Sequence, residues 1–282
     1  MTLARDRKLN EMGLGPVWKL RRDTPIAEAA TAPPGRGSSS TAATPATTAA
    51  NVAATTAATT KSVAGSNTPG RSVAYFRPAE IDDGAVRSDA IANMDWDALK
   101  AAVTDCRACA LCEGRKNTVF GSGDENAQWL IVGEAPGAEE DARGEPFVGK
   151  AGQLLDAMLA ALDLRRGHNV YVANVLKCRP PENRNPEPAE VARCAPHLWR
   201  QVALIRPRVI LLMGRFAVQA VLGTDASIAS LRGRRHSFAG TPIVVTYHPA
   251  YLLRTPVDKA LAWQDLLLAR ATCLEGLANA AP

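Results

Sequence analysis

The chain lacks aromatic residues over a long N-terminal stretch, since none occurs between Lys19 and Ala74. That stretch is mostly Ala, Thr, Ser, Gly and Pro, which cannot bury enough apolar surface to offset the entropy lost on ordering. The sequence has no run of 18 apolar residues, which excludes a transmembrane helix. Its N-terminus has charges but no apolar segment after them, which argues against a secretion signal. We therefore expect a cytoplasmic protein whose folded part is about the last 190 residues.

The folded part also lacks net charge. Residues 1–72 hold nine basic and four acidic residues, so the whole excess of +5 lies in the tail and residues 73–282 sum to zero. A role in nucleic-acid binding therefore cannot be argued from the net charge of the domain, and it requires a specific site.

Composition divides the chain into three segments. Residues 1–24 are a short basic piece with scattered apolar residues, residues 25–90 are a flexible low-complexity linker, and residues 91–282 are a globular domain. The expected strands of the domain are Trp129–Gly133, Val170–Val175, Val209–Met213 and Ile243–Tyr247. The expected helices are Ala151–Leu164, Ala189–Ile205, Arg215–Leu222 and Asp258–Leu277. This alternation predicts a doubly wound α/β fold, with a mainly parallel sheet flanked by helices.

Polar side chains stand where the expected strands end. Glu134 follows the first strand, Asn174 closes the second, and His248 follows the fourth. Since parallel sheets bind ligands beyond the carboxyl ends of their strands, a small polar ligand is expected there. Residues 149–152 open a helix with two glycines and a lysine, which can hold a phosphate, although the P-loop spacing is absent.

The cysteines form a pattern typical of metal ligands. They are Cys106, Cys109, Cys112, Cys178, Cys194 and Cys273. A close pair, Cys106 and Cys109, and a distant pair, Cys178 and Cys194, suit either tetrahedral zinc or an iron–sulfur cluster, and spacing alone does not choose. Cys112 can replace Cys109, while Cys273 is expected in the core. The alternative is that the distant pair are ordinary buried thiols.

The segment after the last strand, Thr246–Arg254, combines His248 with two leucines and an arginine. Exposed leucines beside an arginine suit insertion into a base stack. A lone histidine is usually structural, but its place after a strand favours a functional role for His248. The other three histidines, interpreted as structural or surface residues, are His168, His197 and His236.

Several motifs, taken in order, resemble family 4 uracil-DNA glycosylases, the iron–sulfur class of that superfamily. The motifs are Gly133–Asp141, Pro146–Gly152, Asn174–Pro181 with Asn183 and Arg184, Cys194, and His248–Arg254. The resemblance covers residues 103 to about 275. It implies hydrolytic excision of uracil from single- or double-stranded DNA, by a nucleoid-associated monomer. It also implies a [4Fe–4S] cluster on Cys106, Cys109, Cys178 and Cys194, with Cys112 as a spare.

The same resemblance implies roles for individual side chains. Asn174 pairs with the uracil edge, Phe147 stacks on the flipped ring, and His248 donates a hydrogen bond to the developing charge at uracil O2. Leu252 or Leu253 fills the space that the flipped base leaves, and Arg254 contacts phosphate.

The water that attacks the sugar is the open part of this assignment. Ala135 stands where the best-known uracil glycosylases carry an aspartate, so it lines the substrate site without acting as a base. We therefore expect a dissociative route in which Glu134 or Glu140 orients the water or stabilises the cation. Residues 179–193 contain no histidine, which disfavours the covalent trapping of uracil seen in a sister class.

Two other classes of function stay open. The first is a non-catalytic iron–sulfur protein that binds DNA damage, although such a protein needs neither Asn174 nor His248. The second is a cluster-dependent redox enzyme, which no flavin or nicotinamide fingerprint supports.

Residues 1–24 resemble the N-terminal peptide of the psi subunit of the bacterial clamp loader. Trp18 and several leucines stand there in a solvated tail with no core of their own to join. The resemblance implies docking to the clamp loader, with the linker setting the effective concentration at the fork. The alternative is that the basic tail only adds non-specific affinity for DNA.

Overall fold

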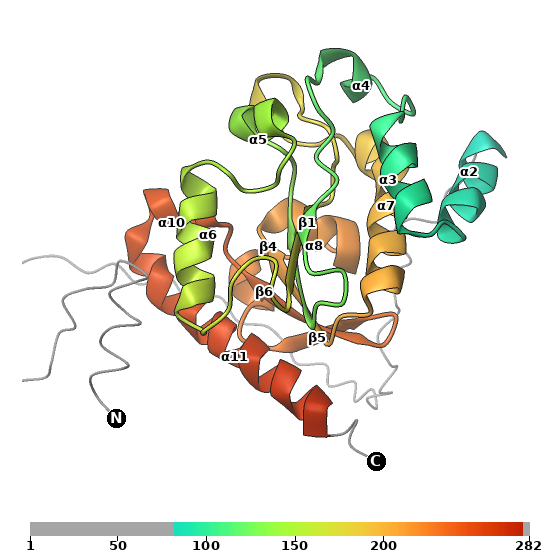
Figure 1. Cartoon of the computed structure of the whole chain (residues 1–282). Helices are drawn as coiled ribbons and strands as arrows, with labels where there is room; N and C mark the ends of the chain where they lie inside the picture. Colours follow the sequence, from blue (N-terminus) through green and yellow to red (C-terminus); the bar gives the residue numbers. More distant parts are fainter. Residues whose placement is uncertain (1–81, 279–282) are drawn as a thin grey trace, which may run out of the picture. The chain divides into compact units, whose positions relative to one another are not determined.

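The computed structural model describes residues 82–278, which form a six-stranded sheet between two layers of helices (Figure 1). The strand order is β1-β3-β2-β4-β6-β5. The strands are β1 (Ser122–Gly123), β2 (Trp129–Gly133), β3 (Val170–Asn174), β4 (Val209–Met213), β5 (Arg235–Phe238) and β6 (Thr241–Thr246). The four central strands are parallel, as expected, whereas β1 and β5 pair antiparallel at the two edges.

Helices follow the strands and cover both faces of the sheet. They are α2 (Asp82–Ala92), α3 (Trp96–Thr104), α4 (Leu111–Gly114), α5 (Ala138–Arg143), α6 (Lys150–Ala160), α7 (Pro188–Ile205), α8 (Arg215–Leu222), α9 (Ile228–Leu231), α10 (Pro249–Arg254) and α11 (Lys259–Ala278). Within residues 82–278, no helix has both the length and the hydrophobicity that crossing a membrane requires.

Helix α2 changes the expected segmentation. It begins at Asp82 and packs against α7, so the linker boundary expected at residue 90 falls inside this helix. The proposed docking peptide, residues 1–24, and the linker as far as residue 81 lie outside the described residues.

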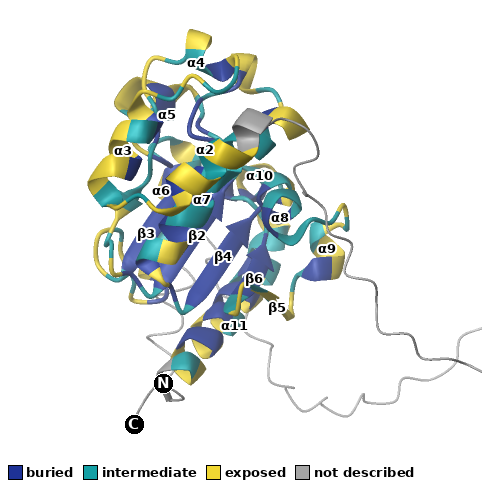
Figure 2. Ribbon diagram, turned by 90° about the vertical axis from the view of Figure 1, so that its right-hand side faces the viewer, coloured by how far each residue is buried: buried dark blue, intermediate teal, exposed yellow. Residues whose placement is uncertain are grey.

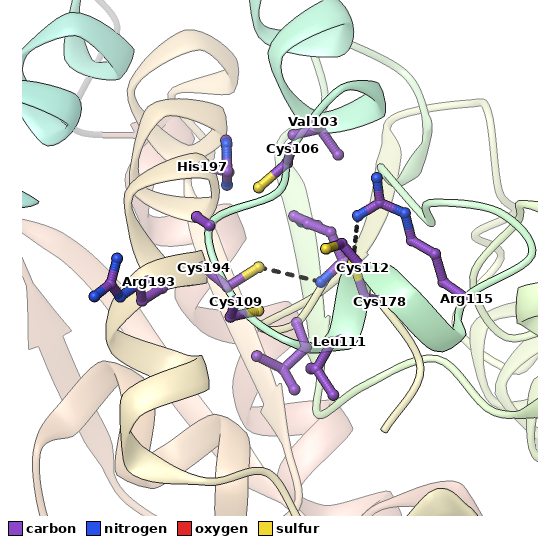
Figure 3. A pocket seen from close by; sticks show the side chains of 13 residues that line it. Val103, Cys106, Cys109, Leu111, Cys112, Arg115, Cys178, Arg193, Cys194 and His197 are labelled. Carbon is purple, nitrogen blue, oxygen red and sulfur yellow. Dashed lines mark hydrogen bonds between the residues drawn. The ribbon is translucent and has the colours of Figure 1, made fainter. Parts of the chain in front are cut away.

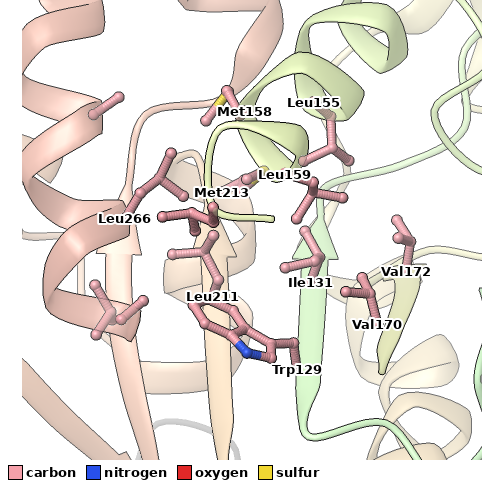
Figure 4. Packing of buried hydrophobic residues seen from close by; sticks show 14 of the residues in the cluster. Trp129, Ile131, Leu155, Met158, Leu159, Val170, Val172, Leu211, Met213 and Leu266 are labelled. Carbon is pink, nitrogen blue, oxygen red and sulfur yellow. The ribbon is translucent and has the colours of Figure 1, made fainter. Parts of the chain in front are cut away.

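The core lies in two layers because successive side chains of each central strand point to opposite faces. On one face Ile131, Val172 and Leu211 pack against α6 and α11 (Figure 4). On the other face the alternate residues, such as Leu130 and Leu212, pack against α7 and α8. The strands are therefore buried throughout, as Figure 2 shows, and this explains their continuous apolar sequences.

The register of the central strands brings the functional candidates together. Gly133 at the end of β2 lies directly opposite Asn174 at the end of β3, and Met213 of β4 lies opposite Thr246 of β6. The loops that leave these positions therefore meet at one edge of the sheet, where a parallel α/β sheet places its ligand site.

Candidate active site and thiol pocket

Asn174 and Phe147 meet above the end of β2. A Cβ atom on Gly133 would overlap both the Asn174 carboxamide and the Phe147 ring, so glycine is required for this close approach. Asn174 is 2 % exposed, and its side chain makes no hydrogen bond to another residue of the described part of the chain. A buried amide without a protein partner is available to a ligand, and the adjacent ring offers that ligand a flat apolar surface.

The backbone around Phe147 is held in an unusual conformation. Phe147 has a φ of 55°, and its carbonyl approaches α6 so closely that only a glycine at position 152 fits. The Arg166 guanidinium donates to the Phe147 carbonyl at 2.7 Å and to the Pro146 carbonyl at 2.6 Å. Arg166 therefore holds the backbone that carries the Phe147 ring, a role that nothing in the local sequence motif indicates.

His248 lies beside the same ring. The two rings stack with centroids 5.5 Å apart and an interplanar angle of 25°. The backbone N–H of Ala250 donates to His248 Nδ1 at 3.1 Å, where His248 caps α10. Burial, aided by the charge of Arg254 and opposed by Glu140, lowers the pKa of His248 to about 4. The imidazole is therefore neutral at physiological pH, and its remaining proton is on Nε2, which is the donor.

The structure separates the two glutamates that the sequence left as alternatives. Both carboxylate oxygens of Glu140 accept backbone hydrogen bonds, from Gly137 at 3.1 Å and from Val148 at 3.0 Å and Gly149 at 3.3 Å. Glu140 thus caps α5 and fills the N-terminus of α6. It also accepts from Gly149, the first of the residues that the sequence suggested for holding a phosphate, so a carboxylate already occupies that amide.

Glu134 is the carboxylate that stays available. Its side chain makes no hydrogen bond within residues 82–278. Burial raises the pKa of Glu134 to about 7, against the opposing charge of Arg215. A half-buried carboxylate with a pKa near neutrality, at the ligand edge of the sheet, is a candidate for handling a water molecule.

The two leucines of α10 have different environments. Leu252 is fully buried in the core between the sheet, α6 and α11, whereas Leu253 is 43 % exposed. The prediction that Leu252 can enter DNA is therefore wrong, because withdrawing it would empty a core position. Leu253 and the exposed Arg254 remain as candidates for contact with DNA.

Five cysteines from three segments line one pocket next to this site (Figure 3). They are Cys106, Cys109, Cys112, Cys178 and Cys194, and Cys273 lies in the core as expected. All six are free thiols. In the described part of the chain no three His, Cys, Asp or Glu side chains converge as the ligands of a single ion.

Donors and positive charges surround the sulfur atoms of this pocket. Arg115 donates to Cys178 Sγ at 3.1 Å, Arg87 of α2 to Cys106 Sγ at 3.5 Å, and the backbone N–H of Lys177 to Cys194 Sγ at 3.2 Å. Such N–H···S contacts and cations stabilise thiolates over thiols. Several thiols with cationic neighbours therefore fit an anionic thiolate-bound iron–sulfur cluster, such as the one that the resemblance implies.

Without a bound group, three of these thiols, Cys109, Cys178 and Cys194, are protonated. Burial raises the pKa of the Cys194 thiol to about 12 and also raises the pKa values of Cys109 and Cys178. Binding a metal group here must therefore release protons.

The thiol pocket and the candidate active site share their walls. Leu176 donates its backbone N–H to the Glu134 carbonyl at 3.0 Å, and Leu176 also lines the thiol pocket. Ala135 packs against the cluster formed by Leu111, Leu176 and Cys178. Ala135 thus connects the loop after β2 to the thiol pocket through apolar contact.

Comparison with known proteins agrees with this geometry. A sequence model of the uracil DNA glycosylase superfamily matches residues 120–267, more than half of the chain. A type-4 uracil-DNA glycosylase of Archaeoglobus fulgidus is 44 % identical over 168 residues, which are 57 % of this chain and 84 % of that protein. A type-4 enzyme of Pyrobaculum aerophilum is 40 % identical over 183 residues (62 % and 93 %), and a type-5 enzyme of the same organism is 34 % identical over 146 residues (46 % and 64 %).

The match extends over both the sheet and the loops that carry Asn174 and His248. The chain therefore belongs to the uracil-DNA glycosylase superfamily. Within it, the chain is similar to the type-4 enzymes over most of their length.

Proposed function

We propose that the protein excises uracil from DNA by hydrolysing the N-glycosidic bond. The observation that carries this proposal is the convergence of an unpartnered buried amide, an aromatic ring and a neutral imidazole at one end of the sheet. Asn174, Phe147 and His248 supply them. The alternative, a protein that only binds damaged DNA, does not require a hydrogen-bond donor of fixed tautomer beside the stacking ring.

Recognition begins with a base flipped out of the helix, because the target bond is inaccessible inside a stack. The Phe147 ring receives one face of the base. The Asn174 carboxamide accepts from uracil N3–H and donates to O4. Cytosine presents the opposite pattern at these positions and would leave the buried amide unpaired.

Bond cleavage leaves negative charge on the departing uracil. His248 Nε2–H donates to O2 and stabilises that charge without transferring a proton, as an oxyanion donor does. Glu134 orients the water that captures the sugar cation, and Leu253 and Arg254 contact the DNA around the site. Glu140 acts only by holding the loops.

Cys106, Cys109, Cys178 and Cys194 would hold a [4Fe–4S] cluster in the thiol pocket. When bound, the cluster supplies a structural cross-link among the segments that carry these cysteines, since base excision needs no electron transfer. We also keep the proposals that the protein acts as a monomer and that residues 1–24 dock to the clamp loader.

Asn174→Ala is expected to lower the single-turnover rate of uracil excision by about 10²-fold, because the amide contacts the base as charge develops on it. The rate is measured on an oligonucleotide with one uracil. Asn126→Ala, which changes an exposed asparagine in the turn before β2, is the matched control and should react at the rate of the unmodified protein. An undiminished rate in Asn174→Ala would remove Asn174 from the site.

The pH dependence of kcat/KM is expected to rise through about pH 7, because the Glu134 carboxylate, whose pKa is about 7, is the active form. His248 adds no slope there, since its pKa is about 4 and it is already neutral. Glu134→Gln should abolish the rise, and Glu145→Gln, on the exposed loop after α5, should keep it. An unchanged profile in Glu134→Gln would contradict the assignment.

Folding stability should change in the opposite direction. The pKa of Glu134 in the folded state lies above its ordinary value of 4.5. The contribution of Glu134 to the free energy of unfolding is therefore complete below pH 4.5 and is lost as the pH rises through about 7. Glu134→Gln should therefore reduce the loss of stability between pH 5 and pH 8.

A further inference from the structure

Lys177 is a fully buried lysine between the thiol pocket and the strand end that carries Asn174. It is 2 % exposed. Its Nζ donates to the backbone carbonyl of Asn174 at 2.9 Å and to Gln201 Oε1 at 2.7 Å. Gln201, from α7, donates in turn to the Phe120 carbonyl at 2.9 Å. The ammonium is thus held in one place by groups that are themselves fixed.

A buried ammonium is costly unless a negative charge compensates it. Among the residues that the structure describes, no carboxylate forms an ion pair with Lys177. The groups that could supply negative charge are thiols of the pocket that it lines: Cys194 and Cys178 interact electrostatically with the Lys177 side chain, and its own backbone N–H contacts Cys194 Sγ. Thiolates bound to a cluster would supply the missing charge.

The segment from Asn174 to Lys177 is also tied to the loop after β2. Val175 donates its backbone N–H to the Gly133 carbonyl at 3.0 Å, and Leu176 donates to the Glu134 carbonyl at 3.0 Å. A shift of this segment would therefore move the uracil-reading amide and the water-orienting carboxylate together.

We propose that Lys177 is a positioning residue that couples the bound cluster to uracil recognition. Its ammonium is the counter-ion of the cluster thiolates, and it also holds the backbone carbonyl of Asn174 in place. This inference rests on the proposed function, and it gives the cluster a second consequence beyond cross-linking the fold. A lysine that only filled the core would be replaceable by methionine, whose side chain has a similar length and no charge.

The test compares the full-length protein with its Lys177→Met variant, both prepared without oxygen and normalised to iron content. Lys177→Met is expected to lower the single-turnover rate of uracil excision by about 10- to 100-fold, as small misplacements of a reacting group do. Inhibition by free uracil should weaken by a similar factor. Affinity for DNA with an abasic-site analogue should stay within about twofold, because that DNA has no base for Asn174 to contact.

A second readout does not depend on activity. The visible absorbance of the cluster should be lost several times faster in air in Lys177→Met, because the thiolates have lost a buried counter-ion. Lys100→Met removes an exposed lysine that pairs with Glu125 on the surface, so it is the control for net charge and should match the unmodified protein. Arg115→Met removes a cation from the same pocket without contact to Asn174, and its loss of rate should be at least several-fold smaller.

Three results would overturn the proposal. They are an unchanged rate and uracil inhibition in Lys177→Met, an equal loss of affinity for abasic-site DNA, or an equal loss of rate in Arg115→Met. If Lys177→Met does not fold, Gln201→Met is the deciding variant, because it keeps the charge of Lys177 but removes the hydrogen bond that holds its Nζ. The excision rate and the inhibition by free uracil should then fall together, and unchanged values would contradict the coupling. An unmodified protein that releases no uracil would refute the proposed function instead, while the air-stability comparison would still test the contact with the cluster.

Discussion

His248→Ala is expected to lower the single-turnover rate of uracil excision by about 10²–10³-fold, the usual cost of removing one donor to a developing charge. The donor is effective because it is preorganised: Ala250 fixes the tautomer from one side and the Phe147 ring fixes the plane of the imidazole. The imidazole is also neutral, so it can donate to O2 without the energetic cost of burying an imidazolium.

The His248→Ala variant also loses the cap of α10, which costs about 1 kcal/mol of stability. That cost is too small to unfold a typical domain, so the loss of rate should be seen in folded protein. His236→Ala is the matched control, since His236 lies on the edge strand β5, where its ring contacts the Leu231 carbonyl, and its loss should not affect the rate. A His248→Ala rate within about threefold of the unmodified protein would be inconsistent with oxyanion stabilisation.

Cys178→Ser and Cys194→Ser should each abolish the iron content and the brown colour of the purified protein and greatly lower its thermal stability. Both thiols lie in the buried pocket. A cluster held there would connect the Cys106–Cys112 segment to the loop after β3, so its loss would remove a link that stabilises the fold. A serine hydroxyl is a poor substitute for a thiolate, and it would leave Arg115 or Lys177 without its sulfur partner.

Cys273→Ser is the control for these variants, because it changes a buried cysteine of α11 that lies outside the pocket. It should keep its iron, whatever its effect on stability. The iron and zinc contents of the unmodified protein, prepared without oxygen, decide the identity of the bound group. Zinc without iron would overturn the cluster assignment.

The central strands could be predicted because both of their faces are buried. Val209–Met213 is apolar at every position, and β4 has these bounds. The edge strands could not, since β1 has two residues and β5 alternates exposed polar positions with partly buried ones. Helix α2 was missed because its sequence has little apolar character and its stability depends on packing against α7.

The site was predictable in its strand ends and not in its loop geometry. Asn174 and His248 follow from the rule for parallel sheets. Leu252 and Leu253 are adjacent in a helix, so their side chains point to different faces and have different environments. The sequence does not say which of the two faces the core. The spacing of Gly137 and Glu140 did contain a capping signal that favoured a structural role for Glu140. Lys177 gave only a weak signal, as the single charge within a buried segment.

The most direct test of the account is the release of free uracil by the full-length protein from a single-stranded oligonucleotide with one uracil. The account predicts free uracil and an alkali-labile abasic site in equal amounts, and neither product from matched oligonucleotides with cytosine or thymine at that position. Binding of the uracil oligonucleotide without release of the base, by iron-loaded protein, would contradict the account and favour a protein that only binds damaged DNA.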